Sequence, residues 1–383
     1  VPTPTVAVID TATNNLKAIV PVEGWPRDIV INLAGTKVYV ATPGISTTTV
    51  SVIDTATNTV SATVDVGGYP MQVAVNPAGT KVYVTDRDGT HISVIDTSTN
   101  TLMAQINVGM ITRNVVISPD GKKIYATNPF NNTTSVIDAI TNKVITTISV
   151  GDSPYEIAVT PDGNKVYVTN SGSNTVSVID TATDNVTATV PVGDSPSDIA
   201  VSPDGKKAYV TNSGNYNDPG NNVSVIDTVN NTVTATVPVG IAPLGVAVTP
   251  DGKKIYVTNA ESDNVSVINT ATNKVTATVN SGKYTISYPT GVAIGPFIDS
   301  NMTNQSTGIT SNATEDIGIE ETNLSSSEEQ YAVELNKSKN NNSESDNDSS
   351  SSGNKSSKNN STPGFGLLGS LTCLYGGWKL RKK

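Results

Sequence analysis

A repeat of about 42 residues constrains this chain more than any other feature. The segment VSVID and its variants recur seven times, at steps of 44, 42, 42, 42, 47 and 42 residues. A second segment, VYVTN, recurs six times with the first five of these steps, so the two segments belong to one repeating unit. The longest step is explained by an insertion, SGNYNDPGNN, at 213–222. The first series ends at Asp10, Asp54, Asp96, Asp138, Asp180, Asp227 and Asn269, and the second has its tyrosines at Tyr39, Tyr83, Tyr125, Tyr167, Tyr209 and Tyr256.

Each unit predicts four short β-strands. In the fourth unit they cover 155–160, 165–170, 175–180 and 185–192. The connectors are rich in Gly, Asn, Asp, Pro and Ser and have the length of hairpin turns, which predicts an antiparallel meander. Most of these strands are apolar on both faces, so each sheet must be covered on both sides. Repeats of this length with four strands are typical of propeller blades, each packed between two neighbours.

The count of segments predicts how the ring closes. The motif that opens each unit, Pro-x-x followed by an apolar run, occurs seven times, starting at Pro26, Pro70, Thr112 (in place of Pro), Pro154, Pro196, Pro243 and Pro289. The chain starts in the third strand of a unit and ends the repeats with a first strand. We therefore expect an all-β, seven-bladed propeller over 1–297, with four-stranded antiparallel blades and a closing blade shared by both termini. One strand of that blade is missing, which we attribute to N-terminal truncation, with a three-stranded closing blade as the alternative.

Residues 298–362 are dominated by Asn, Ser, Thr and Glu. Such a composition buries too little apolar surface to offset chain entropy, which predicts a disordered stalk. Ten Asn-x-Ser/Thr sequons make it a candidate for glycosylation in an exported protein. The candidate asparagines are Asn301, Asn304, Asn312, Asn323, Asn336, Asn341, Asn347, Asn354, Asn359 and Asn360.

The last segment, 363–383, combines a short apolar run with a basic end. The run from Phe365 to Trp378 is shorter than the roughly 20 residues that a membrane-spanning helix needs. We expect a short C-terminal hydrophobic helix that acts as a temporary membrane anchor, like the sorting tails that are removed after export.

The composition argues against several classes of function. A net charge of −10 leaves no basic face for nucleic acid. One cysteine and one histidine rule out a Cys/His metal cluster within the chain. We expect no catalytic residue, no bound metal and no cofactor.

The loops that enter the first strand of each unit vary between repeats, so the scaffold does not require their residues. These loops meet at one mouth of the central channel in a propeller, which makes them candidates for a ligand-binding site. Among these candidates, Asp28, Glu156 and Asp198 are the acidic residues that would converge if a cation were bound there. The candidate residues are Trp25, Arg27, Asp28, Tyr69, Gln72, Arg113, Asn114, Tyr155, Glu156 and Asp198.

The repeat resembles the YVTN seven-bladed propellers, which are common in surface-layer and other cell-surface proteins of methanogenic archaea. The tail resembles the PGF-CTERM signal of archaeal surface proteins, carried here by Pro363, Gly364 and Phe365 and the basic end. This second resemblance implies removal of the tail by an archaeosortase-like enzyme and attachment of a lipid.

Together these features predict a non-enzymatic, extracellular protein of the cell envelope, anchored to the membrane through its C-terminus. Its role would be structural or adhesive, and its partners other cell-surface proteins or glycans that contact the propeller faces. The alternative is a ligand-binding propeller, or a metal-dependent hydrolase or lactonase, with its site at the channel mouth.

Overall fold

The computed structural model describes residues 4–44, 47–280, 289–295 and 371–376, the last of these by its backbone alone. Every regular element within these ranges is a β-strand. No helix in the described ranges is long and apolar enough to cross a membrane. The expected stalk, its ten candidate asparagines and Pro363, Gly364 and Phe365 lie outside the described residues.

Six antiparallel sheets each consist of four consecutive strands. Blade 1 contains β3 (Asp28–Ile31), β4 (Lys37–Pro43), β5 (Thr48–Asp54) and β6 (Thr59–Asp65). Blade 2 contains β7 (Pro70–Val75), β8 (Lys81–Asp86), β9 (His91–Asp96) and β10 (Thr101–Asn107). Blade 3 contains β11 (Val115–Ile117), β12 (Lys123–Asn128), β13 (Thr133–Asp138) and β14 (Lys143–Ser149). Blade 4 contains β15 (Pro154–Val159), β16 (Lys165–Asn170), β17 (Thr175–Asp180) and β18 (Asn185–Pro191). Blade 5 contains β19 (Pro196–Val201), β20 (Lys207–Gly214), β21 (Pro219–Asp227) and β22 (Thr232–Pro238), and blade 6 contains β23 (Pro243–Val248), β24 (Lys254–Asn259), β25 (Asn264–Asn269) and β26 (Lys274–Asn280).

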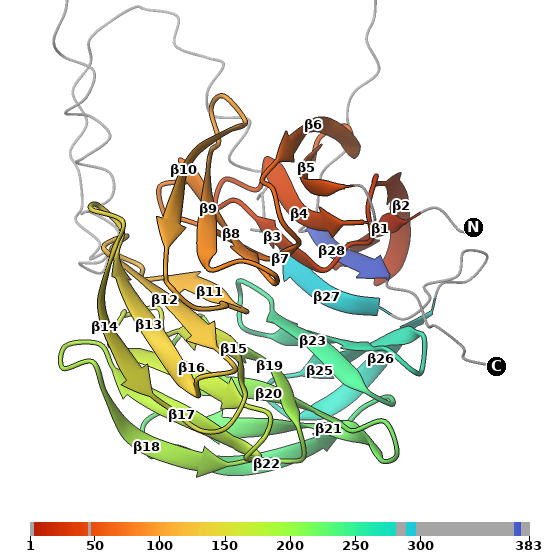
Figure 1. Ribbon diagram of the computed structural model, residues 1–383. Helices are drawn as coiled ribbons and strands as arrows, with labels where there is room; N and C mark the ends of the chain where they lie inside the picture. The colour runs from red at the N-terminus through yellow and green to blue at the C-terminus, as the bar shows by residue number, and fades with distance from the viewer. Residues whose placement is uncertain (1–3, 45–46, 281–288, 296–370, 377–383) are drawn as a thin grey trace, which may run out of the picture. The chain divides into compact units, whose positions relative to one another are not determined.

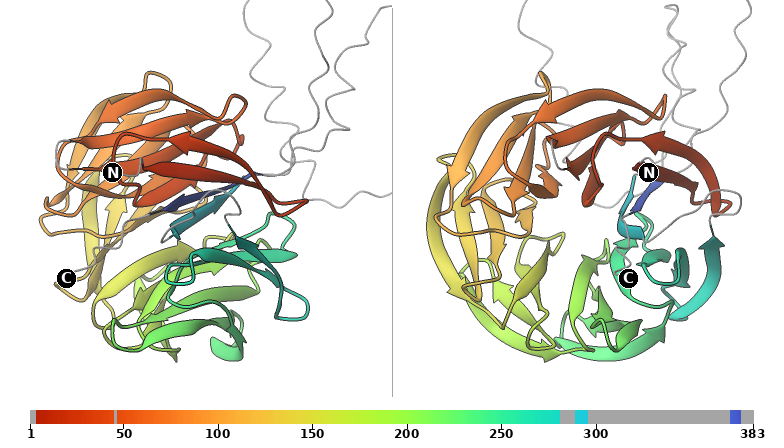
Figure 2. Two further views of the ribbon diagram at one scale, coloured as in Figure 1. Left: turned by 90° about the vertical axis from the view of Figure 1, so that its right-hand side faces the viewer. Right: turned by 45° about the vertical axis from the view of Figure 1, so that its right-hand side comes forward.

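The blades lie around a common centre, with the first strand of each blade innermost and the fourth outermost (Figures 1 and 2). This arrangement confirms the predicted all-β propeller with four-stranded antiparallel blades. The insertion at 213–222 lengthens the hairpin between β20 and β21 and leaves the order of strands in blade 5 unchanged.

The second and third strands are buried on both faces because each blade packs between two others. In blade 4, Val176 and Val178 contact a cluster shared with blade 5, whereas Ile179 and Val166 contact a cluster shared with blade 3. The small β-branched side chains predicted from the repeat fill these spaces between sheets.

A lysine at the start of the second strand joins blades 1, 3, 4 and 5 each to the next blade. The ammonium of Lys165 in blade 4 donates to the carbonyl oxygen of Thr228 in blade 5 at 2.5 Å. The ammonium of Lys207 reaches Thr270 of blade 6 in the same way, at 3.1 Å. The lysine therefore has a structural role in the repeat, as a strap between sheets.

A further four-stranded sheet combines both ends of the chain, in the order β2, β1, β28, β27. Its strands are β1 (Thr5–Asp10), β2 (Asn15–Pro21), β27 (Pro289–Ile294) and β28 (Leu371–Gly376). The hairpin β1–β2 packs against blade 6 on one face and blade 1 on the other. Hydrogen bonds also connect blade 6 to this hairpin. Lys254 donates to the carbonyl oxygen of Thr11 at 2.9 Å, and the Tyr256 hydroxyl donates to Asn14 Oδ1 at 2.6 Å.

The expected C-terminal helix is wrong for residues 371–376, which form strand β28. The register of β28 is that of the second strands elsewhere: Cys373 pairs with Ala293 and Val8, as Tyr167 pairs with Ala158 and Val178. Two factors account for the difference. Tyr, Thr and Cys suit a strand as well as a helix, and β1 and β27 would otherwise leave two unpaired edges facing each other.

Candidate functional site

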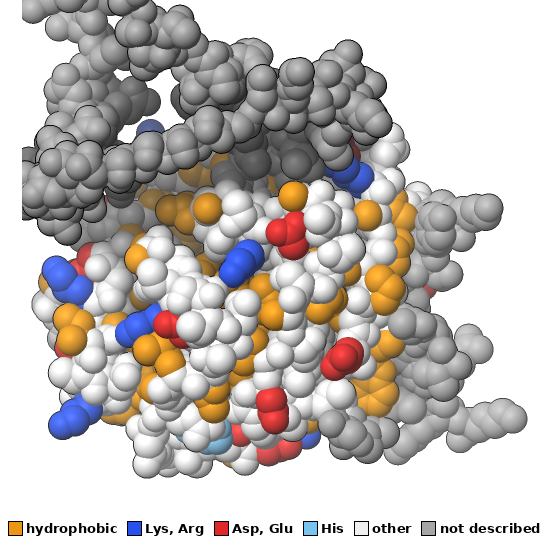
Figure 3. All heavy atoms as spheres, turned by 90° about the horizontal axis from the view of Figure 1, so that it is seen from above, with side chains coloured by type: hydrophobic (Ala, Val, Ile, Leu, Met, Phe, Trp, Pro, Cys, Tyr) orange, Lys and Arg blue, Asp and Glu red, His pale blue; other side chains and the backbone are white. Residues whose placement is uncertain are grey.

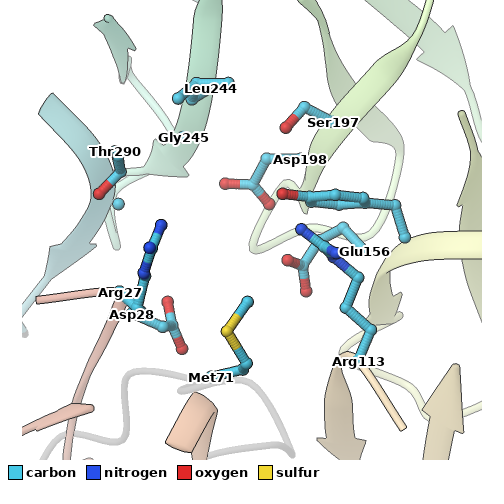
Figure 4. A pocket seen from close by; sticks show the side chains of 12 residues that line it. Arg27, Asp28, Met71, Arg113, Glu156, Ser197, Asp198, Leu244, Gly245 and Thr290 are labelled. Carbon is cyan, nitrogen blue, oxygen red and sulfur yellow. The ribbon is translucent and has the colours of Figure 1, made fainter. Parts of the chain in front are cut away.

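A cavity of about 300 Å³ lies at the centre of the propeller (Figure 4). Its lining follows one rule of the repeat: it consists of the residues one and two positions after the proline, or its substitute Thr112, that opens each first strand. The lining residues are Arg27, Asp28, Met71, Arg113, Tyr155, Glu156, Ser197, Asp198, Leu244, Gly245, Thr290 and Gly291. The repeated backbone thus brings together, from around the ring, the side chains that differ between repeats.

The threonine of VYVTN holds this layer in place. In blade 4, Thr169 Oγ1 accepts from the backbone N–H of Glu156 at 2.9 Å and contacts the carbonyl oxygen of Ser197 in blade 5 at 3.2 Å. Four other threonines make the same pair of bonds, one from the N–H of the residue two positions after the opening proline or Thr112 and one to a lining carbonyl of the next blade. They are Thr85, Thr127, Thr211 and Thr258. In blade 1 the equivalent position is Ala41, which lacks the hydroxyl.

Two of the carboxylates bond to the backbone of the next blade. Asp28 Oδ2 accepts from the N–H of Val73 at 3.0 Å. Asp198 accepts from the N–H of Ile199 and, through its other oxygen, from the N–H of Val246, both at 2.7 Å. Each aspartate therefore ties two first strands together at the wall of the cavity.

The third carboxylate, Glu156, gathers amides from two earlier blades. Its Oε2 accepts from the side-chain amides of Asn114 at 2.6 Å and Gln72 at 3.3 Å, and its Oε1 accepts from the N–H of Ile157 at 3.2 Å. Three successive blades are joined through this one side chain.

These carboxyl groups hold protons more tightly than usual. Burial raises the pKa of Asp28 to about 7 and the pKa of Asp198 to about 6, against the opposing effect of their backbone hydrogen bonds. Burial also raises the pKa of Glu156 well above its ordinary value, and the negative charges of Asp198 and Asp28 add to this effect. The cluster therefore changes its charge near neutral pH.

Two guanidinium groups face the same cavity. The Arg113 guanidinium lies over the ring of Tyr155, 3.8 Å from its centroid. Arg27 donates to the hydroxyl of Tyr69 at 3.3 Å. Each arginine is thus positioned by a tyrosine.

The ten candidate residues are placed in three groups. Arg27, Asp28, Arg113, Tyr155, Glu156 and Asp198 line the cavity. Gln72 and Asn114 bond to Glu156, and Tyr69 contacts Arg27. Trp25 is 38% exposed in the loop before β3 and is not among the lining residues.

Sequence reasoning did not single out four further lining residues, Met71, Ser197, Leu244 and Thr290. The signal that would have found them is the repeat itself, because all four occupy the first position after the proline. Only residues with conspicuous chemistry had been chosen, although position in the repeat determines what faces the centre.

Asp28, Glu156 and Asp198 share one cavity, but the described residues contain no group of three His, Cys, Asp or Glu side chains placed to hold a metal ion. Their oxygens are instead directed to backbone and amide donors.

Two family models match separate parts of the chain. The model described as "Cytochrome D1 heme domain" matches residues 40–160, and the model described as "Lactonase, 7-bladed beta-propeller" matches residues 180–294. No curated protein sequence matches the chain.

Solved structures resemble it in fold. Hydrazine synthase of Kuenenia stuttgartiensis is 24% identical with a TM-score of 0.64, over 71% of this chain and 90% of that one. A functionally unknown protein from Desulfotomaculum acetoxidans is 17% identical with a TM-score of 0.66, over 77% of this chain and 99% of that one. The chain is a β-propeller with sequence similarity to the cytochrome D1 and lactonase propellers.

Proposed function

We propose that this chain is a non-enzymatic, cell-surface protein with a seven-bladed propeller head, closed by strands from both termini, and a structural or adhesive role. The observation that carries the proposal is how the central carboxylates are used. General acid–base and nucleophilic catalysis need a reactive group placed against a base or a substrate proton. Here Asp28, Asp198 and Glu156 are each bonded to backbone or amide donors that connect neighbouring blades. This favours a scaffold that presents a surface.

The face around the channel mouth suits contact with other molecules. By the order of the strands, the loops that enter first strands and the loops between second and third strands lie at the same end of the propeller. Three aromatic side chains on these loops are exposed: Trp25 by 38%, Phe130 by 79% and Tyr216 by 92%. Exposed aromatic residues are enriched where proteins contact one another.

Charge on the head is scattered. On the described part of the face seen in Figure 3, acidic and basic side chains are scattered among hydrophobic side chains and uncharged groups, and no basic patch is formed. We therefore propose other surface proteins or glycans as partners in preference to nucleic acid.

The location is proposed from the sequence. The sequon-rich stalk would hold the head away from the membrane, and the tail with Pro363, Gly364 and Phe365 would be exchanged for a lipid by an archaeosortase-like enzyme. Surface biotinylation of intact cells, followed by mass spectrometry of the labelled protein from membranes, tests both points. Labelling of the head, with glycans on the stalk and a lipidated end near 362–365, is the expected result. A protein found only inside the cell contradicts the proposal.

A metal-dependent lactonase is the second candidate, favoured by the family-model match over 180–294. Within that range the cavity receives a single carboxylate, from Asp198. Lactone hydrolysis by the full chain, measured with and without added divalent metal, decides between the two. We expect no turnover above background in either condition, and metal-dependent turnover that is lost in Asp198→Asn would establish the second candidate.

A further inference from the structure

Two guanidinium groups and three carboxyl groups surround the central cavity. Arg27 and Arg113 carry positive charge, and Asp28, Glu156 and Asp198 are carboxylic acids. No ion pair within the described ranges joins any of these five residues to another. Opposite charges held in one cavity but apart from each other leave room for a third molecule between them.

Each guanidinium group contacts a tyrosine: Arg113 lies over the ring of Tyr155, and Arg27 donates to Tyr69. The charge of Arg113 also acts on Glu156, where it partly opposes the rise in the pKa of that carboxyl group. A guanidinium has five N–H donors in one plane, so both groups keep donors for an anionic ligand. Figure 4 shows them on different sides of the cavity, with the carboxylates of Asp198 and Glu156 between them in the view.

The carboxylates keep acceptor capacity of their own. Each carboxylate oxygen has two lone pairs, and the bonds from Val73 and Val246 each occupy one. A further polar group lines the cavity: the buried hydroxyl of Thr290, from the closing sheet, makes no hydrogen bond with the part of the chain that the structure describes. A ligand that donates several hydrogen bonds would find acceptors at this wall.

We propose that this cavity binds a small zwitterion of the free amino acid class, with its ammonium group toward Asp28, Glu156 and Asp198 and its carboxylate toward Arg27 and Arg113. A simple anion would face three carboxyl groups, and a simple cation would face two guanidinium groups. A molecule with both charges a few ångströms apart satisfies both sets of side chains. The volume of about 300 Å³ accommodates a small amino acid. This inference does not depend on the cell-surface location.

The test is isothermal titration calorimetry on the full chain with a panel of glycine, L-alanine and L-serine. Propionate and ethylamine serve as matched halves of alanine, because each lacks one of its two charged groups. We expect at least one amino acid of the panel to bind, and both half-molecules to bind at least about tenfold more weakly, since each forgoes charge-assisted hydrogen bonds.

Variants identify the site. Arg27→Gln removes an exposed guanidinium and is expected to weaken binding at least about tenfold. Arg87→Gln is the matched control, because Arg87 contacts the same tyrosine, Tyr69, but pairs with Asp88 and is not among the lining residues. Asp198→Asn removes the charge and keeps one acceptor oxygen, for the backbone N–H of Val246, while giving up the bond from the N–H of Ile199. It is expected to weaken binding with an unchanged circular dichroism spectrum.

Three results would overturn the inference. The first is a panel that does not bind at all. The second is ethylamine or propionate binding as tightly as alanine, which would indicate a site for a single charge. The third is equal loss of affinity in Arg27→Gln and Arg87→Gln, which would place the ligand elsewhere.

Discussion

The two residues that follow each opening proline determine what the centre of this propeller presents. Their backbone is held alike in blades 2 to 6 by the threonine of VYVTN, so their side chains are the variable part of the layer. At the second position the residues are Asp28, Gln72, Asn114, Glu156, Asp198, Gly245 and Gly291. The acids and amides meet on one arc of the ring, and the glycines leave the opposite arc open.

The raised pKa of Asp28 predicts how the stability of the folded protein depends on pH. Its pKa rises from an ordinary 3.8 to about 7 on folding, because the carboxyl group is buried. Above pH 5 this carboxyl group is already ionised in the unfolded chain, whereas in the folded protein it loses its proton between pH 5 and pH 8. The free energy of unfolding therefore falls as pH rises through this range. The aspartates of the turns, such as Asp54, have lowered pKa values and stay ionised over this range, so they do not oppose the trend.

The measurement is urea unfolding at pH 5 and pH 8. In Asp28→Asn the decrease between the two pH values should be smaller than in the wild type, by about 1–3 kcal/mol, at roughly 1.4 kcal/mol per unit of pKa. Asp54→Asn, on an exposed turn, is the control and should keep the wild-type decrease. The same slope in wild type and Asp28→Asn would show that Asp28 titrates normally.

At the scale of single residues, the sequence predicted part of the site. Variation between repeats pointed to Arg27, Asp28, Arg113, Glu156 and Asp198, because the shared scaffold does not require residues that differ from one repeat to the next. The hydrogen bonds that these side chains make could not be predicted from the sequence. Whether Asn114 turns toward Glu156 or toward water depends on side-chain rotamers and on the spacing between blades, which a repeat does not encode.

At the scale of elements, the second strands connect the ring. In blade 4 the second strand contributes the bridging lysine at its start and the bridging threonine near its end. Its alternating apolar residues fill the spaces on both of its faces. The strands themselves were predictable because alternation and glycine-containing turns reinforce each other in every unit.

Thr169→Val tests the bridge between blades 4 and 5. Valine has nearly the shape of threonine but leaves the N–H of Glu156 and the carbonyl oxygen of Ser197 without their partner. We expect a loss of about 1–3 kcal/mol in the free energy of unfolding, measured with urea. Thr189→Val, in exposed strand β18 of the same blade, is the control and should change it by less than about 0.5 kcal/mol. Equal effects of the two substitutions would contradict a bridging role.

The tail is the element that the sequence did not settle. A short apolar run that contains both Leu and β-branched or aromatic residues fits a helix or a buried strand equally well by pattern. The choice depends on what lies next to it. Here the neighbours are the edges of β1 and β27, which no local pattern near residue 371 reveals.

At the scale of the whole molecule, the two ends of the chain meet in one sheet. The hairpin β1–β2 is fixed by its packing between blades 6 and 1 and by the strap from Lys254. Strand β28 then pairs with β1 on one side and β27 on the other. Contacts between residues more than 240 positions apart in the sequence, such as Lys254 with Thr11, make the ring one cooperative unit.

Deletion of residues 371–383 tests this closure, with deletion of 377–383 as the control. Losing β28 removes the backbone partners of β1 and β27, whereas the control leaves every described strand intact. We expect the larger deletion to lower the midpoint of thermal unfolding by at least about 4 °C relative to the control, as a loss of about 2 kcal/mol or more does in a domain of this size. Equal midpoints would show that β28 adds nothing to the ring.

Strand β28 also gives the proposed processing a topological consequence. Cleavage near Pro363, Gly364 and Phe365 would release residues 371–376 together with the rest of the tail. The precursor would then be a complete ring, and the mature head would have a vacancy one strand wide between β1 and β27. Such a vacancy accepts an extended segment of another chain by main-chain pairing. Anchoring and self-closure would then be successive states of the same protein, and maturation itself would create the place where a neighbouring molecule can insert.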